Sequence, residues 1–152
     1  MTDQDFHRTI AVAAGADRAY AALTQEFGGW WTRTATVFAK PGDIVTFEFP
    51  PQRSYWTFAA KALEPGRRVE MECVEALHLI DDKPDADPEE WLGTRVEWII
   101  APRDGGTMIT VWHKGLRPEL DCYEICSSGW DRFFVDSLQA YLTTGKGMPH
   151  GG

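Results

Sequence analysis

Two cysteines near the end of the chain have a spacing that suits metal binding or redox chemistry. Cys122 and Cys126 are four residues apart, so a helix would place both thiols on one face. Third and fourth ligands are missing from the pattern, because Cys73 stands alone on an expected strand and only His113 is expected nearby. We therefore expect no metal site, and interpret the two cysteines as buried thiols that pack as small apolar side chains.

His113 is the sharpest single candidate for chemistry. It ends an expected strand on which Ile109 and Val111 share its face, so it closes an otherwise apolar inward row. There it could hydrogen-bond a ligand or act as a general base. It could equally be a buried histidine whose ring nitrogens are satisfied within the fold, and we favour that structural role.

The acidic residues on the expected strands offer little catalytic chemistry. Glu72 and Glu97 alternate with apolar neighbours, which predicts an outward, solvated position. Glu75 is expected on the inner side with Met71 and Cys73. Without a nucleophile motif, a phosphate loop or a dinucleotide fingerprint, the sequence indicates no cofactor and favours a binding protein over an enzyme.

The composition bounds the class of protein. The chain has 152 residues, which suits one domain over residues 1–152, and its seven Trp, eight Phe and four Tyr predict an aromatic interior. A net charge of -8 opposes binding to nucleic acid or to anionic membranes. The polar start, an odd cysteine count and the lack of a long apolar run predict a cytoplasmic protein with no membrane span.

Hydrophobic periodicity predicts one helix and one long terminal helix around a run of strands. The expected strands cover residues 6–13, 43–49, 55–62, 68–75, 94–100 and 107–113. Asp17 is the expected N-cap of the first helix, which ends at Gly28-Gly29, and an acidic loop is expected over 81–90. Short turns between strands favour antiparallel pairing, so the sequence predicts an α+β helix-grip fold, in which a curved antiparallel sheet wraps around the long C-terminal helix.

The aromatic residues are either core or the lining of a pocket between sheet and helix. Periodicity does not separate the two, and for the strands before residue 65 it does not fix which face is inward. The residues expected to line a pocket for an apolar or aromatic ligand are Trp30, Trp31, Phe47, Phe49, Trp56, Met71, Trp98, His113, Trp130 and Phe134.

Several motifs resemble a known family. They include Ala14 to Thr24, Gly29-Trp30-Trp31, and the ending from Gly129-Trp130 to Gly145. Together these resemble the START-like SRPBCC superfamily, and within it the branch named after the C-terminal domain of the heat-shock-protein-90 ATPase activator. Trp91-Leu92-Gly93-Thr94 and the run from His113 to Pro118 are similar to one bacterial subgroup of that branch.

The resemblance implies a fold and a range of functions. Members of the superfamily bind lipids, hormones or polyketide-like compounds between sheet and helix, some act as cyclases, and the eponymous activator binds a chaperone. Our first hypothesis is a small hydrophobic or aromatic ligand in this cavity. The alternatives are a protein-interaction module of co-chaperone type and a cyclase-like enzyme using His113 as base. A homodimer is compatible with the sequence, but no feature requires it.

Overall fold

Six strands form one antiparallel sheet in the computed structural model, which describes residues 5–151. The strands are β1 (Phe6–Val12), β2 (Ile44–Glu48), β3 (Tyr55–Glu64), β4 (Arg68–Leu77), β5 (Arg95–Arg103) and β6 (Gly106–Lys114). Their order across the sheet is β1-β6-β5-β4-β3-β2, and every neighbouring pair is antiparallel. Apart from the step from β1 to β6, each strand pairs with the next in sequence, as expected when short turns connect them.

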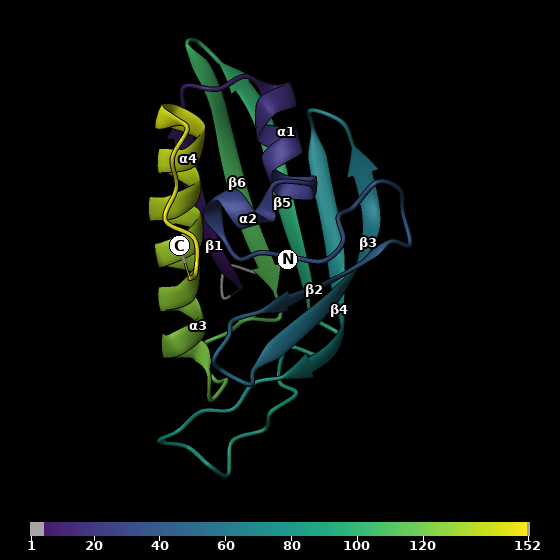
Figure 1. Ribbon diagram of the computed structural model, residues 1–152, viewed down its shortest axis with the longest axis vertical. Helices are drawn as coiled ribbons and strands as arrows, with labels where there is room; N and C mark the ends of the chain where they lie inside the picture. Colours follow the sequence, from purple (N-terminus) through teal and green to yellow (C-terminus); the bar gives the residue numbers. More distant parts are fainter. Residues whose placement is uncertain (1–4, 152) are drawn as a thin grey trace.

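A long helix at the end of the chain packs against this sheet. It consists of α3 (Tyr123–Trp130), a π-helical stretch η1 (Asp131–Leu138) and α4 (Gln139–Thr144), and it ends at Gly145, whose φ of 88° is the left-handed conformation typical of a helix C-terminus. Figure 1 shows this helix beside the sheet, with α1 (Ala16–Thr24) and α2 (Phe27–Trp30) lying over the strands. The predicted helix-grip α+β fold is confirmed.

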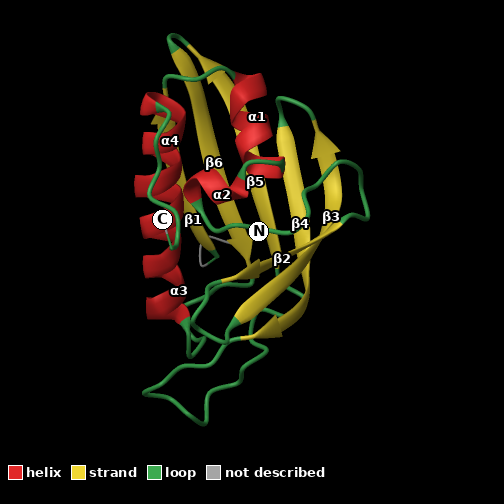
Figure 2. Ribbon diagram, in the orientation of Figure 1, coloured by secondary structure: helices red, strands yellow, loops and turns green. Residues whose placement is uncertain are grey.

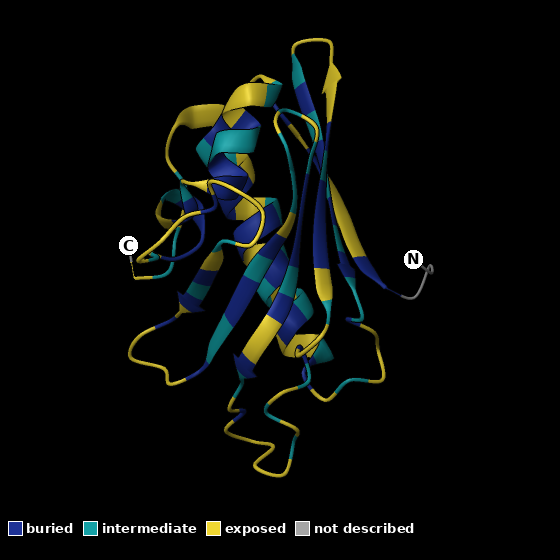
Figure 3. Ribbon diagram, turned by 90° about the vertical axis from the view of Figure 1, so that its right-hand side faces the viewer, coloured by how far each residue is buried: buried dark blue, intermediate teal, exposed yellow. Residues whose placement is uncertain are grey.

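The core lies between the concave face of the sheet and the helices. On β6 every second residue is buried, namely Thr107, Ile109, Val111 and His113. The residues between them are half-buried. Figure 3 shows buried, intermediate and exposed positions following one another along the strands. The strand pattern predicted from sequence is therefore the one that builds the core.

Two local irregularities correct the sequence interpretation. The β3–β4 register shifts between Thr57 and Phe58, so that Cys73 faces inward, Val74 and Glu75 are both exposed, and Ala76 is buried. A bulge of this kind reverses the alternation that follows it. The expected inward position of Glu75 is wrong, and its carboxylate accepts a hydrogen bond from the Tyr55 hydroxyl at 2.5 Å.

Glu97 points outward as predicted, but it is not solvated. It is 7% exposed, because Arg68 and Lys114 from the neighbouring strands cover it and bond its carboxylate. Burial raises the pKa of Glu97, but the two cations outweigh that effect and the pKa is lowered overall. The same cations reach Glu70, so the outer face of the sheet carries a connected ion network.

The first helix begins two residues earlier than expected. Gly15 is its N-cap and Asp17 lies in its first turn, where a carboxylate still interacts favourably with the helix dipole. The polar start of the chain was one ground for the expected cytoplasmic location, and its residues 1–4 lie outside the described residues.

The chain after the long helix folds back along it, as the yellow trace in Figure 1 shows. The Ser137 hydroxyl donates to the carbonyl of Trp30 at 2.6 Å and accepts from the backbone N–H of Met148 at 2.7 Å. A Cβ on Gly147 would lie 2.6 Å from the carbonyl oxygen of Gly29. Gly29 of the Gly29-Trp30-Trp31 motif thus meets Gly147 at one close backbone contact.

Figure 2 shows a long connection without helix or strand at one end of the molecule, between β4 and β5. This is the acidic loop predicted over residues 81–90. Among residues 5–151, no helix combines the length and apolar character that a bilayer crossing demands.

Candidate functional site

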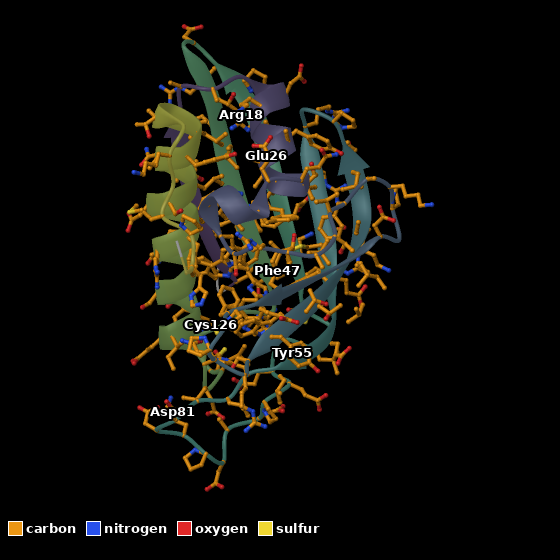
Figure 4. The ribbon with its side chains drawn as sticks, in the orientation of Figure 1. Arg18, Glu26, Phe47, Tyr55, Asp81 and Cys126 are labelled. Carbon is orange, nitrogen blue, oxygen red and sulfur yellow. The ribbon has the colours of Figure 1, made fainter. Side chains whose placement is uncertain are left out.

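An aromatic cavity lies between the first turns of the long helix and strands β2 and β3. Its volume is about 150 Å³. It is lined by Trp31, Phe47, Phe49, Gln52, Trp56, His78, Trp91, Ile125, Cys126, Gly129, Trp130 and Phe133. Figure 4 shows Phe47 in the interior of the fold and Cys126 on the helix above the loop that carries Asp81.

Half of the residues expected to line a pocket lie on this cavity. They are Trp31, Phe47, Phe49, Trp56 and Trp130. The other five are fully buried and pack behind the lining in the core, namely Trp30, Met71, Trp98, His113 and Phe134. Trp56 and Phe58 point inward, which resolves the strand face that periodicity left open.

Rings from five parts of the chain make the cavity wall continuous. Trp31 stacks on Phe47 with centroids 4.2 Å apart, and it also contacts Trp130 at 5.2 Å. Trp56 contacts Trp91 at 5.2 Å, and Trp91 lies parallel to Trp130 at 6.2 Å. Aromatic pairs at these separations stabilise one another, so the wall is preorganised by contacts among its own members.

The sequence interpretation missed two important lining residues, Trp91 and His78. Both lie at the ends of the connection between β4 and β5, where no hydrophobic period assigns a face. The acidic loop holds them in place through backbone contacts, since the His78 N–H donates to the carbonyl of Pro88 at 2.7 Å. The motif Trp91-Leu92-Gly93-Thr94, which entered the sequence interpretation only through its resemblance to a bacterial subgroup, was the available signal.

His113 is held by hydrogen bonds on both ring nitrogens. Trp130 Nε1 donates to Nδ1 at 3.1 Å, and Nε2 lies 2.9 Å from the Thr94 hydroxyl, which donates to the carbonyl of Trp91 at 2.6 Å. This series of hydrogen bonds assigns the imidazole proton to Nε2, and the lone pair on Nδ1 is already used to accept from Trp130. Full burial lowers the pKa of His113 to about 3, with Asp5 acting in the opposite direction.

This geometry gives His113 a structural part in the fold. A general base must reach the proton it removes, and the His113 ring is 0% exposed and does not line the cavity. Instead it links β6, the loop before β5 and the long helix through one hydrogen-bonded chain. The interaction fixes Trp130 and Trp91, two rings of the cavity wall.

The two thiols of the terminal helix have a histidine beside them, but it is not His113. Ligand atoms of His78, Cys122 and Cys126 all lie within 4.8 Å of one another. His78 Nδ1 is 4.0 Å from Cys126 Sγ. The prediction that only His113 lies near these thiols is wrong, because the connection after β4 returns His78 to the helix start.

The environment shifts the pKa values of the two thiols in opposite directions. A hydrogen bond from the Cys126 thiol lowers the pKa of Cys122, and His78 and Trp91 act in the same direction against burial. The pKa of Cys126 is raised, first by the neighbouring Cys122 and then by burial. Cys73 lies apart on β4, and burial raises its pKa to about 12.

A larger hollow of about 660 Å³ lies at the opposite end of the long helix, between the β5–β6 turn and α4. It is an open surface depression, with Arg103, Asp104, Gln139 and Thr143 among its lining residues. Solvated side chains of this kind do not converge on a ligand. The smaller aromatic cavity is therefore the better candidate site.

Solved structures similar to this chain share its fold at low sequence identity. The solution structure of the Aha1 dimer from Colwellia psychrerythraea is 23% identical with a TM-score of 0.75, over 97% of this chain and 100% of that chain. A crystal structure from Mesorhizobium loti is 19% identical with a TM-score of 0.70, over 86% and 91%. A protein of the dynemicin biosynthetic locus is 19% identical with a TM-score of 0.69, over 96% of this chain and 49% of that chain.

No curated protein matches the chain in sequence. A family model does match it over residues 13–143, which run from the end of β1 to the last turn of the long helix and contain the whole cavity wall. That model describes the Activator of Hsp90 ATPase homolog 1-like protein. The fold and this match together show that the chain belongs to the Activator of Hsp90 ATPase homolog 1-like family, with a START-like domain.

Proposed function

We propose that this protein binds a small aromatic molecule, about one ring in size, in the cavity between β2, β3 and the long helix. The observation that carries the proposal is an aromatic wall that contains a buried and unpartnered donor, the indole N–H of Trp56. A wall of rings favours a flat apolar ligand, and a buried donor without a partner favours a ligand with an acceptor atom.

The volume limits the size of the ligand. A mostly aromatic cavity of about 150 Å³ has the size that accommodates a molecule such as benzene, whereas drug-sized ligands need roughly 300 Å³ or more. Burying about 200 Å² of ring surface at about 25 cal/mol per Å² contributes at most about 5 kcal/mol, which corresponds to a submillimolar dissociation constant. Larger ligands would need the side chains at the cavity mouth to move.

The buried donor defines the polar part of the ligand. Trp56 Nε1 has no hydrogen-bond partner in the described part of the chain. An orphaned buried donor costs about 1–3 kcal/mol, and a ligand oxygen at this point would remove that cost. We therefore expect phenols or aryl carbonyl compounds to bind more tightly than hydrocarbons of the same shape.

The first experiment compares the native and denatured masses of freshly purified protein. An additional mass that leaves on unfolding would identify a ligand carried from the cell. Binding is then measured with phenol and with toluene as defined probes, by the quenching of tryptophan fluorescence and by ligand-observed NMR. Failure of both probes to bind at millimolar concentration would overturn the proposal.

Gly129 provides a variant that fills the cavity with little strain. It lines the cavity, and a Cβ placed on it meets no atom within 4 Å. Gly129→Leu is therefore expected to fold, to gain helix propensity and to lose phenol binding at least tenfold. The matched control is Ser128→Leu, which adds the same side chain at the exposed neighbouring position and is expected to keep binding.

Trp56→Phe tests the polar contact separately from the shape. It keeps a ring at this position and removes the N–H donor. The wild-type preference for phenol over toluene is expected to fall by about fivefold, the equivalent of one hydrogen bond. An unchanged preference would mean that this donor does not face the ligand.

The geometry supports the alternatives less well. A cyclase using His113 would need an accessible base, and both nitrogens of this ring are already bonded in the core. A protein-interaction module would need a broad apolar surface. Among the exposed apolar side chains, Leu79 and Ile125 share a surface groove of about 540 Å³ beside the cavity, but Asp81 and other charged residues line the same groove.

A homodimer is the one assembly that a comparison suggests. The similar Colwellia psychrerythraea protein was solved as a dimer. In this chain β2 is an edge strand of the sheet, and Ile44 on it is 54% exposed. We propose that two copies of the chain pair through their β2 edge strands. Sedimentation of wild type and Ile44→Lys tests it, since a monomeric wild type refutes the pairing.

A further inference from the structure

Three side chains with good metal-ligand chemistry converge beside the aromatic cavity. His78 follows β4, Cys122 precedes α3, and Cys126 lies one turn into that helix. Their ligand atoms lie within 4.8 Å of one another. Two thiols and an imidazole form a ligand set that zinc prefers, and the set is assembled from segments 44 residues apart in sequence.

The spacing is close to that of a bound ion. With zinc about 2.3 Å from sulfur and about 2.0 Å from nitrogen, tetrahedral geometry puts neighbouring ligand atoms about 3.5–3.8 Å apart. The observed separation of Cys126 Sγ from His78 Nδ1 is 4.0 Å. The three ligand atoms lie within 4.8 Å of one another, so side-chain rotations that move them inward by roughly 1 Å would bring them to these separations.

The surroundings fix these ligands independently of any metal. The Glu90 carboxylate accepts the backbone N–H groups of Asp121 at 2.9 Å and Cys122 at 3.0 Å, which holds the loop to the helix start. The His78 ring packs against Trp56 with centroids 5.1 Å apart. Ligands supported in this way lose little freedom on binding.

A second feature of the site points to a ligand. Trp91 is 6% exposed, and its buried indole Nε1 makes no hydrogen bond of normal geometry within residues 5–151. The groups with which this N–H interacts are the Cys122 and Cys126 thiols. Its ring lines the cavity beside Cys126 and His78. An N–H group at this position is suited to bond a metal-bound thiolate, which is a strong acceptor once the sulfur loses its proton.

We propose that His78, Cys122 and Cys126 bind one zinc ion, whose fourth coordination position faces the aromatic cavity. Two of the three ligands, His78 and Cys126, line that cavity, so the open position and the entry path are the same space. Three protein ligands with one open position are the arrangement of catalytic zinc sites, whereas closed structural sites have four. The inference does not depend on small-molecule binding, because the ligands are the chain's own.

The test uses untagged full-length protein, reduced with a phosphine that does not bind metals. Zinc content is measured by elemental analysis, and Co²⁺ is titrated as a spectroscopic probe. We expect one ion per chain and a thiolate-to-cobalt charge-transfer band. Cys122→Ser and Cys126→Ser are expected to lose that band, and His78→Ala is expected to weaken binding by more than about tenfold, the usual cost of losing even an outer hydrogen-bond partner.

Two control variants separate this site from adventitious binding. Cys73→Ser removes the buried thiol outside the cluster, and His7→Ala removes an exposed histidine on β1. Both are expected to bind Co²⁺ as wild type does. The proposal is overturned if wild-type protein takes up no Co²⁺, or if the Cys73→Ser spectrum changes as much as the Cys126→Ser spectrum. Metal uptake is measured without phenol, so either proposal can fail alone.

Discussion

His113 makes the stability of this protein depend on pH in a way that one substitution removes. The ring is neutral and buried in the folded state, where its pKa is lowered from 6.5 to about 3, first by burial. In the unfolded chain it takes up a proton below pH 6.5, so acid stabilises the unfolded state. The contribution of His113 is therefore fully present above pH 6.5 and is lost progressively between pH 6.5 and pH 3.

The size of the effect follows from the two pKa values. Their difference corresponds to about 5 kcal/mol in strong acid, of which about 3 kcal/mol is lost between pH 7.5 and pH 4.5. That is a large share of the roughly 5–15 kcal/mol by which a native domain is stable. Carboxylates such as Glu97 add to the acid sensitivity, so a variant is needed to isolate the histidine.

His113→Gln supplies that comparison, because an amide can accept from Trp130 and donate to Thr94 without titrating. Urea unfolding is measured for both proteins at pH 7.5 and pH 4.5. The variant is expected to be less stable at pH 7.5, but to lose about 3 kcal/mol less on acidification. Equal losses in the two proteins would refute the reasoning, as would native-state NMR showing the wild-type His113 ring protonated at pH 4.5.

Three further substitutions test close packing and the outer ion network. Gly29→Ala would put a Cβ 2.5 Å from Cε1 of Tyr141, so we expect a loss of about 1–3 kcal/mol, smaller when Tyr141→Leu is also present in a double-mutant cycle. Gly106→Ala would drive a Cβ into the carbonyl oxygen of Val12, a backbone atom that cannot rotate away, and its melting temperature is expected to fall further than that of Gly29→Ala. Glu97→Gln leaves two cations partly uncompensated, so urea unfolding should show a loss of about 2–3 kcal/mol that shrinks as the pH is lowered.

The strands and the long helix were predictable from sequence because apolar residues recur every second residue in a strand and every three to four residues in a helix. On β6, Ile109, Val111 and His113 alternate with exposed or half-buried residues, and this pattern alone assigns the inner face. On β4 the same reasoning failed after Cys73, because a bulge inserts one extra residue and no sequence signal marks it. Alternation predicts a face only where the register is regular.

The site was less predictable than the fold for two physical reasons. Trp98 and Trp130 have the same side-chain type on equally apolar faces, yet one is core and the other lines the cavity, because only the packed neighbours decide which atoms are covered. His78 joins Cys122 through a loop whose path depends on tertiary bonds such as that from Glu90. Contacts across a loop of this length leave no periodic trace in the sequence.

The cavity and the thiol cluster share one wall, and this has consequences for both. Trp91, His78 and Cys126 border the cavity, and the loop that carries the first two is tied to the helix start by Glu90 and by the Lys83 ammonium, which donates to the Asp121 carbonyl at 2.9 Å. A small molecule in the cavity that contacts Trp91 would therefore also affect the positions of the Cys122 and Cys126 sulfur atoms. Conversely, an ion bound by His78, Cys122 and Cys126 would fix the end of the loop that borders the cavity. The metal and the small molecule would then each favour the same arrangement of this wall, so their binding would be coupled.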